Sequence, residues 1–296
     1  MKAIKRRSYN VAGWISRIIL ALCAIGVIFP LVWLLYTSVK DGQEFSVDLW
    51  AFPKRIKFEN YKLAFEKVVL KDYVSGKEVS VFNMLLNTSL VTIVGVVLVT
   101  FMAAVASFIL EKYKFRGIGF FRTFFFAAIM IPSILLVVPL YTQLREINKD
   151  LFINNRFILA LIYAVQALPM QIFLLSKFIR TIDNGLIEAA RIDGANEFVV
   201  FFKMIVPCIT PILAFVALVT GMAFWNEYTV AMIFMKDYTK MTISVGLTQL
   251  TAAYERVDLT PIFAGYILAL LPIFVLYAIF QKPIQNGMDM DSGIKG

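Results

Sequence analysis

The chain has 296 residues, of which 60% are hydrophobic and only 17% are charged, and its mean hydropathy is +0.77. A soluble domain of this size needs far more polar surface, so the composition excludes an ordinary soluble protein and indicates residence in a membrane. The net charge of +9 then reports membrane topology rather than nucleic-acid binding, and the absence of histidine excludes His-based catalysis.

Six stretches without acidic or basic residues are long enough to span a bilayer, which takes roughly 20 apolar residues in a helix. The predicted spans are 18–36, 81–110, 123–144, 157–176, 204–226 and 259–281. Pro132 and Pro139 lie inside the third span, and each predicts a kink. We therefore predict an all-α integral membrane protein with six transmembrane helices, in which residues 18–281 form one transmembrane domain.

Both ends of the chain are predicted to lie in the cytoplasm. Five basic residues precede the first span and only Lys40 follows it closely, which favours an inside N-terminus, and an even number of spans returns the C-terminus to the same side. Residues 1–17 and 282–296 are then cytoplasmic tails, 37–80 is an outer loop and 177–203 is an inner loop. The first span is longer than a usual signal core and no small-x-small cleavage site follows it, so we expect it to be retained.

The outer loop contains the stretch FENYKLAFEKVVL (58–70), which predicts a short amphipathic helix. Phe58, Tyr61, Phe65 and Val68 recur in it at helical spacing. Such a helix either lies on the membrane or on a partner, or packs on the protein's own outer surface, and the second interpretation is at least as well supported.

No span carries a charge in its middle, which argues against proton pumps, ion-coupled carriers and intramembrane proteases. Cys23 and Cys208 lie in apolar runs without partners of metal-site spacing, which predicts small buried side chains. The strongest polar groups inside the spans are amides and hydroxyls, namely Asn83, Asn87, Thr88, Gln166, Gln171 and Thr220. They suit helix pairing or a neutral polar substrate, and helix pairing is the commoner role.

The sequence also contains no phosphate-binding G-x-x-x-x-G-K-[ST] loop, no H-E-x-x-H and no G-x-S-x-G. If the protein drives active transport, a separate polypeptide must hydrolyse the nucleotide.

The inner loop is predicted to form two short helices separated by a break. Asp183 is a suitable N-cap for a helix over Asn184–Ile192, and Gly194 follows as its stop. Asn196 is the N-cap of a second helix over 197–204, which leads to Pro207 at the start of the fifth span.

One face of the first short helix is predicted to be apolar, with Leu186, Ile187 and Ala190 on it and Ile192 at its edge. Its small residues let another surface approach closely, and its charged residues form the flanks. The small residues are Ala189, Ala190 and Gly194, and the charged ones are Glu188, Arg191 and Asp193. Two interpretations remain equally open, a connecting helix at the lipid interface and a docking site for a partner.

The same loop resembles a known family. It has EAA at 188–190, glycine at 194 and MIVP at 204–207, which is similar to the EAA-x3-G-x9-I-x-L-P signature of binding-protein-dependent ABC importer permeases. Met204 and Val206 conservatively replace the usual Ile and Leu. The Asp-Asn-Gly at 183–185 stands where many members have a proline and an acidic residue.

Further stretches resemble the carbohydrate-importer branch of this family, of the maltose-permease type, and in particular its smaller subunit. They are FENY at 58–61, LNTSL at 86–90, WNEY at 225–228, GL at 246–247 and the glycine-containing tail after Gly287. The resemblance covers essentially the whole chain after the basic N-terminus.

The resemblance implies a permease subunit of an ATP-driven importer of oligosaccharides or other sugars in a bacterial or archaeal cytoplasmic membrane. A second, homologous permease would complete the pathway, two cytoplasmic ABC ATPases would bind beneath the EAA loops, and an extracytoplasmic solute-binding protein would deliver substrate. This chain would then be no enzyme and would bind no cofactor, because Mg–ATP belongs to the ATPases. The residues implied to couple the permease to ATP hydrolysis are Glu188, Ala189, Ala190, Arg191, Asp193, Gly194 and Pro207.

Sugars present hydroxyls and apolar ring faces, so a pathway for them should combine amides with aromatic rings. The candidates are Gln166, Gln171, Trp225, Asn226 and Tyr228. Trp225 and Tyr228 equally fit the role of interfacial anchors. Maltodextrins, other oligosaccharides, uronate oligomers and glycerol phosphate all remain open as substrates, and the lack of a buried basic cluster favours neutral sugars.

The alternative function is a secondary carrier or passive channel for small polar solutes, which needs no ATPase partner. That alternative leaves the EAA spacing unexplained.

Overall fold

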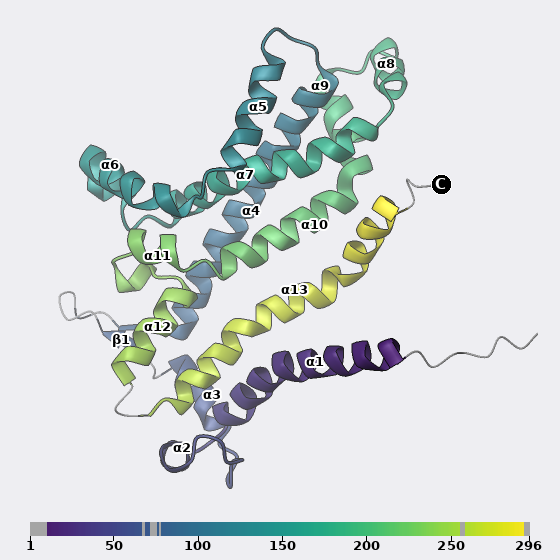
Figure 1. Cartoon of the computed structure of the whole chain (residues 1–296). Helices are drawn as coiled ribbons and strands as arrows, with labels where there is room; N and C mark the ends of the chain where they lie inside the picture. The colour runs from purple at the N-terminus through teal and green to yellow at the C-terminus, as the bar shows by residue number, and fades with distance from the viewer. Residues whose placement is uncertain (1–10, 67–68, 72–75, 77, 255–257, 293–296) are drawn as a thin grey trace, which may run out of the picture.

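The structure is a computed structural model, and it describes residues 11–66, 69–71, 76, 78–254 and 258–292. Long helices form the body of the molecule, and short elements cover its two ends (Figure 1). We call the end that carries α8 the loop end, and the opposite end, which carries α2, α3 and α12, the far end.

The long helices are α1 Val11–Ser38, α4 Val81–Lys112, α5 Ile118–Ile129, α6 Ile134–Phe152, α7 Arg156–Thr181, α10 Val206–Trp225 and α13 Thr260–Ser292. The short helices are α2 Gly42–Val47, α3 Glu59–Glu66, α8 Asn184–Ile192, α9 Glu197–Val199, α11 Thr229–Phe234 and α12 Ile243–Tyr254, with a π-helix η1 Val200–Ile205 and a 3-10 turn η2 Tyr238–Lys240. Two short strands, β1 Val69–Lys71 and β2 Glu78–Ser80, pair antiparallel with Val69 opposite Ser80.

The predicted spans are largely confirmed. Within the described residues, five helices are long and apolar enough to cross a membrane: Gly13–Ser38, Val81–Lys112, Arg156–Thr181, Glu197–Trp225 and Thr260–Ala278. A sixth crossing is present if the bent pair α5 and α6 counts as one span. The last helix continues to Ser292 and so extends into the predicted tail 282–296.

The third predicted span, 123–144, is not a single helix, because α5 ends at Ile129 and α6 begins at Ile134 with a bend of 102° between them. The kink predicted at Pro132 is thus a complete break. Pro132 lies in the break. Proline lacks the amide hydrogen that a helix requires, and it disfavours helical geometry in the preceding residue. Tight turns replace the helical bonds on both sides, with Ile131 N–H donating to the Ala128 carbonyl at 3.3 Å and Leu135 N–H donating to the Pro132 carbonyl at 3.1 Å.

The centre of the body is α4, which packs against α7 and α10. Gly95 on α4 marks the closest approach. A Cβ atom added there would lie 3.0 Å from the ring of Phe224 on α10 and 3.3 Å from the carbonyl oxygen of Ala160 on α7. Lipid tails are as apolar as leucine, so the helices are held together by this close packing rather than by exclusion of water.

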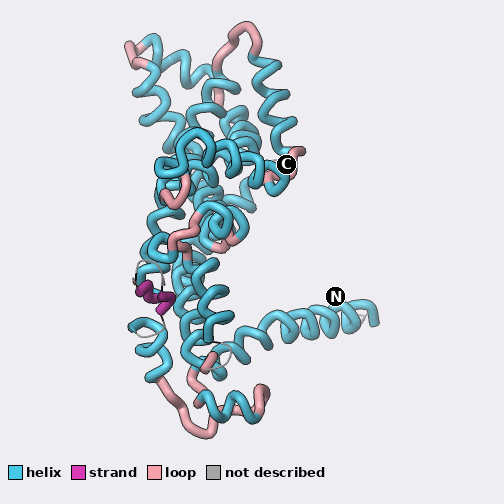
Figure 2. Tube along the Cα trace, turned by 90° about the vertical axis from the view of Figure 1, so that its left-hand side faces the viewer, coloured by secondary structure: helices cyan, strands magenta, loops and turns pink. Residues whose placement is uncertain are grey.

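The first helix, α1, stands apart from this body, as Figure 2 shows. No residue of its most apolar 18-residue stretch is buried, and among its described residues only the last ones, Thr37 and Ser38, are. The ring centre of Trp33 lies 5.5 Å from that of Phe263 on α13. The two terminal helices run in opposite directions, so their outer chain ends point the same way in Figure 1. An even number of crossings requires this arrangement, while the side of the membrane stays a prediction.

The far end is held together by polar contacts of the segment after α1. The side chain of Lys40 is completely buried, and its ammonium donates to the carbonyls of Asp48 at 2.5 Å and Ala51 at 2.8 Å. The amide of Asn60 donates to the carbonyls of Ser38 and Lys40. These bonds compensate the cost of burying a charged ammonium and fix residues 38–60, the first part of the predicted outer loop, as an ordered cap.

The predicted amphipathic helix in this loop exists as α3, and it packs on the protein's own surface against α13 and α4. Its buried residues are Asn60 and Ala64, whereas Phe58 is 72% exposed. The predicted face was therefore the wrong one, and its last member, Val68, lies outside the described residues. Cys23 and Cys208 are exposed on the helices rather than buried.

The packing at Gly95 generates a test. Gly95→Leu forces a large side chain between α7 and α10, and overpacking of this kind typically destabilises by about 1–3 kcal/mol. The variant should melt at a lower temperature than the unaltered protein in detergent. Gly119→Leu is the matched control, since a Cβ at Gly119 meets no atom within 4 Å. Equal melting temperatures for both variants would contradict the packing described here.

Candidate functional site

Both short helices of the loop between α7 and α10 begin at the residues that the sequence predicts. The carboxylate of Asp183 accepts from the Gly185 amide at 3.0 Å and caps α8, Asn184–Ile192. The side chain of Asn196 accepts from the Val199 amide at 2.9 Å and caps α9. Both caps satisfy amides that a helix leaves unpaired in its first turn.

The stop at Gly194 is also confirmed. Gly194 has φ +85°, a left-handed conformation that costs glycine little and other residues more. Its amide donates to the Arg191 carbonyl at 3.1 Å, and the Ala195 amide donates to the Ala190 carbonyl at 2.9 Å. This pair of bonds is a Schellman motif, which closes α8 and turns the chain sharply toward α9.

The second predicted helix, over 197–204, is not regular. Its first turn is α9, and residues Val200–Ile205 then form a π-helix that runs into α10. Pro207 lies at the start of α10, where it cannot donate to the carbonyl of Lys203 and its ring crowds that carbonyl. The wider π turn instead lets Val206 N–H donate to the Phe201 carbonyl, so the chain continues as a helix past the proline.

The inner side of α8 is carried by Ile187 and Ala190, which pack against the core at the loop end, with Ile187 only 3% exposed. Leu186 and Ile192, by contrast, are 46% and 86% exposed. The sequence grouped Leu186 with Ile187 and Ala190, so that part of the predicted face is wrong. Ile192, which was predicted at the edge of this face, lies on the outer side of α8 because of the helical period.

Most of the predicted coupling residues lie on the exposed side of this elbow. Glu188, Ala189, Arg191, Asp193 and Gly194 are all exposed, and Ala190 is half-buried. Ala189 carries only a methyl group there, so another surface can approach the backbone of α8 closely. In Figure 1, α8 lies at the edge of the body.

Two residues at the end of α4 bind the entry to the loop. The ammonium of Lys112 donates to the Ile182 carbonyl at 2.5 Å and to the Asn184 side chain at 3.0 Å. The carboxylate of Glu111, whose side chain is 4% exposed, accepts two bonds from Arg180 at 2.9 and 3.2 Å. The start of α8 is therefore fixed to α4 as well as to α7.

Tyr113, the residue that directly follows α4, binds the exit from the loop. Tyr113 donates its hydroxyl to Glu197, and Glu197 accepts two bonds from Arg191 at 2.9 and 3.2 Å. The Arg191 guanidinium also lies 5.5 Å from the centre of the Tyr113 ring, an attractive cation–π geometry. Burial, and then the bond to Glu197, raises the pKa of the Tyr113 phenol, which keeps it a hydrogen-bond donor at physiological pH.

We call Glu111, Lys112 and Tyr113 together the α4 anchor. Sequence reasoning missed the anchor, although three polar residues directly after a 30-residue apolar stretch give a signal for it. Its partners in and next to the loop are 69 to 84 residues away in the chain, so local spacing could not identify them.

Two of the candidate pathway residues are buried and paired with other helices. Gln171 is 2% exposed and donates to the Thr220 hydroxyl at 2.8 Å, which pairs α7 with α10. Trp225 is 7% exposed, and its indole donates to the Ala269 carbonyl on α13 at 3.1 Å.

The remaining pathway candidates are more accessible. Asn226 is exposed and donates to the Met222 carbonyl of its own helix at 2.8 Å. Tyr228 and Gln166 are half-buried. Glu227 accepts from the Tyr163 hydroxyl and from two amides at the start of α11, so it orders the far end.

A profile of the family described as "Binding-protein-dependent transport system inner membrane component" matches residues 97–289. That match includes α7, the whole loop with its EAA element, and α10. The bundle of apolar helices with a polar elbow at one end is typical of importer permeases, and this chain belongs to that family.

Curated relatives extend the match over nearly the full length. The chain is 28% identical over 276 residues to the diacetylchitobiose uptake system permease protein of Streptomyces coelicolor, covering 93% of this chain and 86% of that protein. It is 27% identical to the melibiose/raffinose/stachyose import permease protein of Bacillus subtilis, with full coverage of both chains. Both are named as permeases for oligosaccharides.

A solved structure shares the fold. A chain of a bacterial ABC transporter involved in import of the acidic polysaccharide alginate matches with a TM-score of 0.77 and 21% identity, covering 95% of this chain and 99% of that chain. At this level of identity the similarity speaks for the fold alone.

Removal of the Arg191–Glu197 ion pair at the loop exit should measurably lower the local stability of the loop. Glu197→Gln removes an ion pair whose side chains are 36% and 48% exposed, and pairs of this kind are worth roughly 0.2–1 kcal/mol. Hydrogen exchange of the amides at 193–195 should therefore speed up by as much as about fivefold.

The matched control is Lys203→Gln, an exposed residue at the same end. Exchange that stays unchanged in Glu197→Gln, or rises equally in the control, would rule out a role for the pair in holding the exit.

Proposed function

We propose that this chain is one permease subunit of an ATP-driven, binding-protein-dependent importer of oligosaccharides, and that a separate ATPase acts on it through α8. The named activities of the relatives support the substrate class. The chain itself would not hydrolyse ATP, and Mg–ATP would be held by the ATPase.

The observation that carries the coupling role is the combination of an open, small-residue face with a rigid attachment. Ala189 leaves the outer side of α8 free for close contact, while the α4 anchor ties both ends of the loop to the central helix. A docking element needs both properties, because a force applied to a loosely attached helix is lost in local motion.

The partners follow from this role. A second, homologous permease would complete the pathway, two ATPase subunits would bind at the loop ends of the pair, and a solute-binding protein would act at the far end. The loop end is then cytoplasmic, as the basic residues before the first span favour. The ordered cap at the far end offers the binding protein a stable surface.

The pathway residues remain proposals. Asn226 and Tyr228 are the more accessible candidates, whereas Gln171 and Trp225 are buried. A sugar would find the amide and the aromatic ring that its hydroxyls and apolar face require at the far end of α10. Neutral oligosaccharides are the preferred class.

Ala189→Trp tests the docking role. The side chain at 189 is exposed, so the subunit should fold and assemble, while the bulky ring obstructs the approach of the ATPase. A clash worth about 1.4 kcal/mol lowers docking affinity about tenfold. The uptake of labelled oligosaccharide by vesicles that contain the reconstituted transporter should fall by about that factor or more. The stimulation of ATP hydrolysis by the oligosaccharide should fall in the same way.

Ala189→Ser is the matched control, and it should transport normally because it adds no bulk. Gly194→Trp is a less specific probe, since its φ of +85° strains any other residue. Normal uptake by Ala189→Trp would contradict docking at this face.

A further inference from the structure

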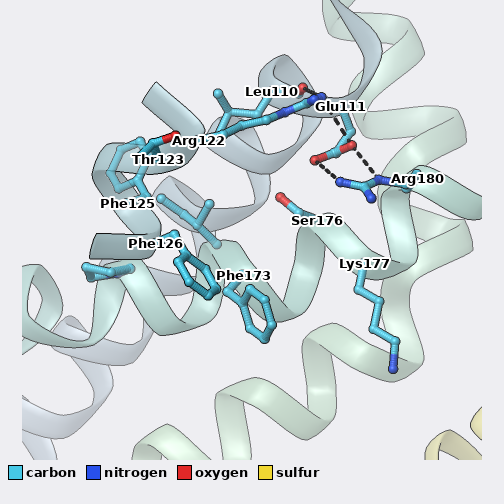
Figure 3. Close-up of a pocket in the computed structure, with 12 residues that line it drawn as sticks. Leu110, Glu111, Arg122, Thr123, Phe125, Phe126, Phe173, Ser176, Lys177 and Arg180 are labelled. Carbon is cyan, nitrogen blue, oxygen red and sulfur yellow. Dashed lines mark hydrogen bonds and ion pairs between the residues drawn. The ribbon is translucent and has the colours of Figure 1, made fainter. Parts of the chain in front are cut away.

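A cavity of about 450 Å³ lies beside the α4 anchor, between the end of α4, α5 and the second half of α7. Figure 3 shows that its lining is divided into two parts. Glu111, Arg122 and Arg180 converge at one end, and Phe126 and Phe173 lie at the other. An amphipathic cavity at the boundary of a membrane span has the polarity of a phospholipid.

The charged end is preorganised by one buried carboxylate. Glu111 is 4% exposed and binds Arg180 at 2.9 Å and Arg122 at 3.4 Å. The two arginine side chains are 68% and 44% exposed, and each guanidinium carries five N–H donors. Glu111 and the Leu110 carbonyl, which accepts from Arg122 at 2.5 Å, occupy only some of these donors, so both arginines keep donors for an incoming oxyanion.

The charge at this end favours an anion. Arg122 and Arg180 meet at this end with the single carboxylate of Glu111, so two positive groups and one negative group give a formal charge of +1. Lys177 also lines the cavity, but its side chain points away from this end. Guanidinium groups bind phosphate oxygens in a planar, two-pronged geometry. A phosphodiester matches this arrangement better than a neutral headgroup does.

The apolar end opens toward the surrounding membrane. The rings of Phe126 and Phe173 lie 5.8 Å apart, and they are 57% and 47% exposed. None of the residues of α5 is buried. Acyl chains can therefore run along these rings while the phosphate stays at the arginines.

We propose that this cavity binds an anionic phospholipid, with its phosphate between Arg122 and Arg180 and its acyl chains along Phe126 and Phe173. Basic pockets between transmembrane helices bind anionic headgroups by this chemistry. The site adjoins the loop attachment, because Arg180 precedes Ile182, which Lys112 holds. A bound lipid therefore strengthens the contact between α4 and α7 at the entry to the loop. This inference does not depend on the proposed function, because lipid binding is measured without transport.

The test is lipid binding to the purified full-length protein in its native complex, delipidated in neutral detergent. Fluorescent phosphatidylglycerol and phosphatidylcholine with the same acyl chains are the probes. The unaltered protein should bind phosphatidylglycerol several-fold more tightly. Arg122→Gln should weaken phosphatidylglycerol binding about fivefold, the contribution of one basic group, and leave phosphatidylcholine binding unchanged.

Arg122→Gln keeps the Glu111–Arg180 pair, so the fold is preserved, and a melting curve checks this. Lys203→Gln is the control, a basic residue at the same end that does not line the cavity, and it should keep the full preference. The proposal is overturned if the unaltered protein shows no preference, if the control loses affinity as much as Arg122→Gln, or if inorganic phosphate displaces the lipid completely at equal concentration.

Discussion

The attachment of the loop to α4 is the interaction on which the rest of the architecture depends. Three consecutive residues at the end of one helix bind the last turn of α7, the start of α8 and the exit to α9. Since α4 also packs against α7 and α10 through the close contact at Gly95, a displacement of α8 reaches the centre of the bundle. Without the anchor, α8 would be held only by its two flanking segments and by the packing of Ile187 and Ala190.

Local signals made much of this predictable. Asp183, Gly194 and Asn196 could be identified because caps and stops depend on residues within a few positions. The spans could be located because apolar length is itself the constraint imposed by the bilayer. The elbow and its exposed small residues were therefore visible in the sequence.

The parts that could not be predicted depend on long-range packing or on the response of the backbone to proline. The partners of Lys112 and Tyr113 are 70 and 84 residues away, which no spacing rule covers. Pro132 breaks one span completely, whereas Pro207 is absorbed by a π turn. A proline in the sequence predicts the loss of one helical hydrogen bond. Whether the helix then breaks or forms a π bulge depends on the neighbouring structure.

The roles of the polar groups inside the spans also depend on long-range packing. The amide of Gln171 and the indole of Trp225 find partners on other helices, because an unpaired donor is costly in a membrane. A polar side chain in a span therefore indicates a contact between helices in the first place, and a substrate pathway only in the second. The charged groups gather at the loop end, where they hold the elbow and line the cavity beside it.

The central claim is that α8 and the end of α4 move as one unit when the transporter changes state. Spin labels at Ile192→Cys and Lys114→Cys, both exposed positions, would report their separation after Cys23 and Cys208 are replaced by serine. Pulsed electron spin resonance on the assembled transporter, without nucleotide and with trapped ATP, should give the same distance in both states. A shift of the distance on trapping would mean that α8 moves independently of α4, and it would contradict this account.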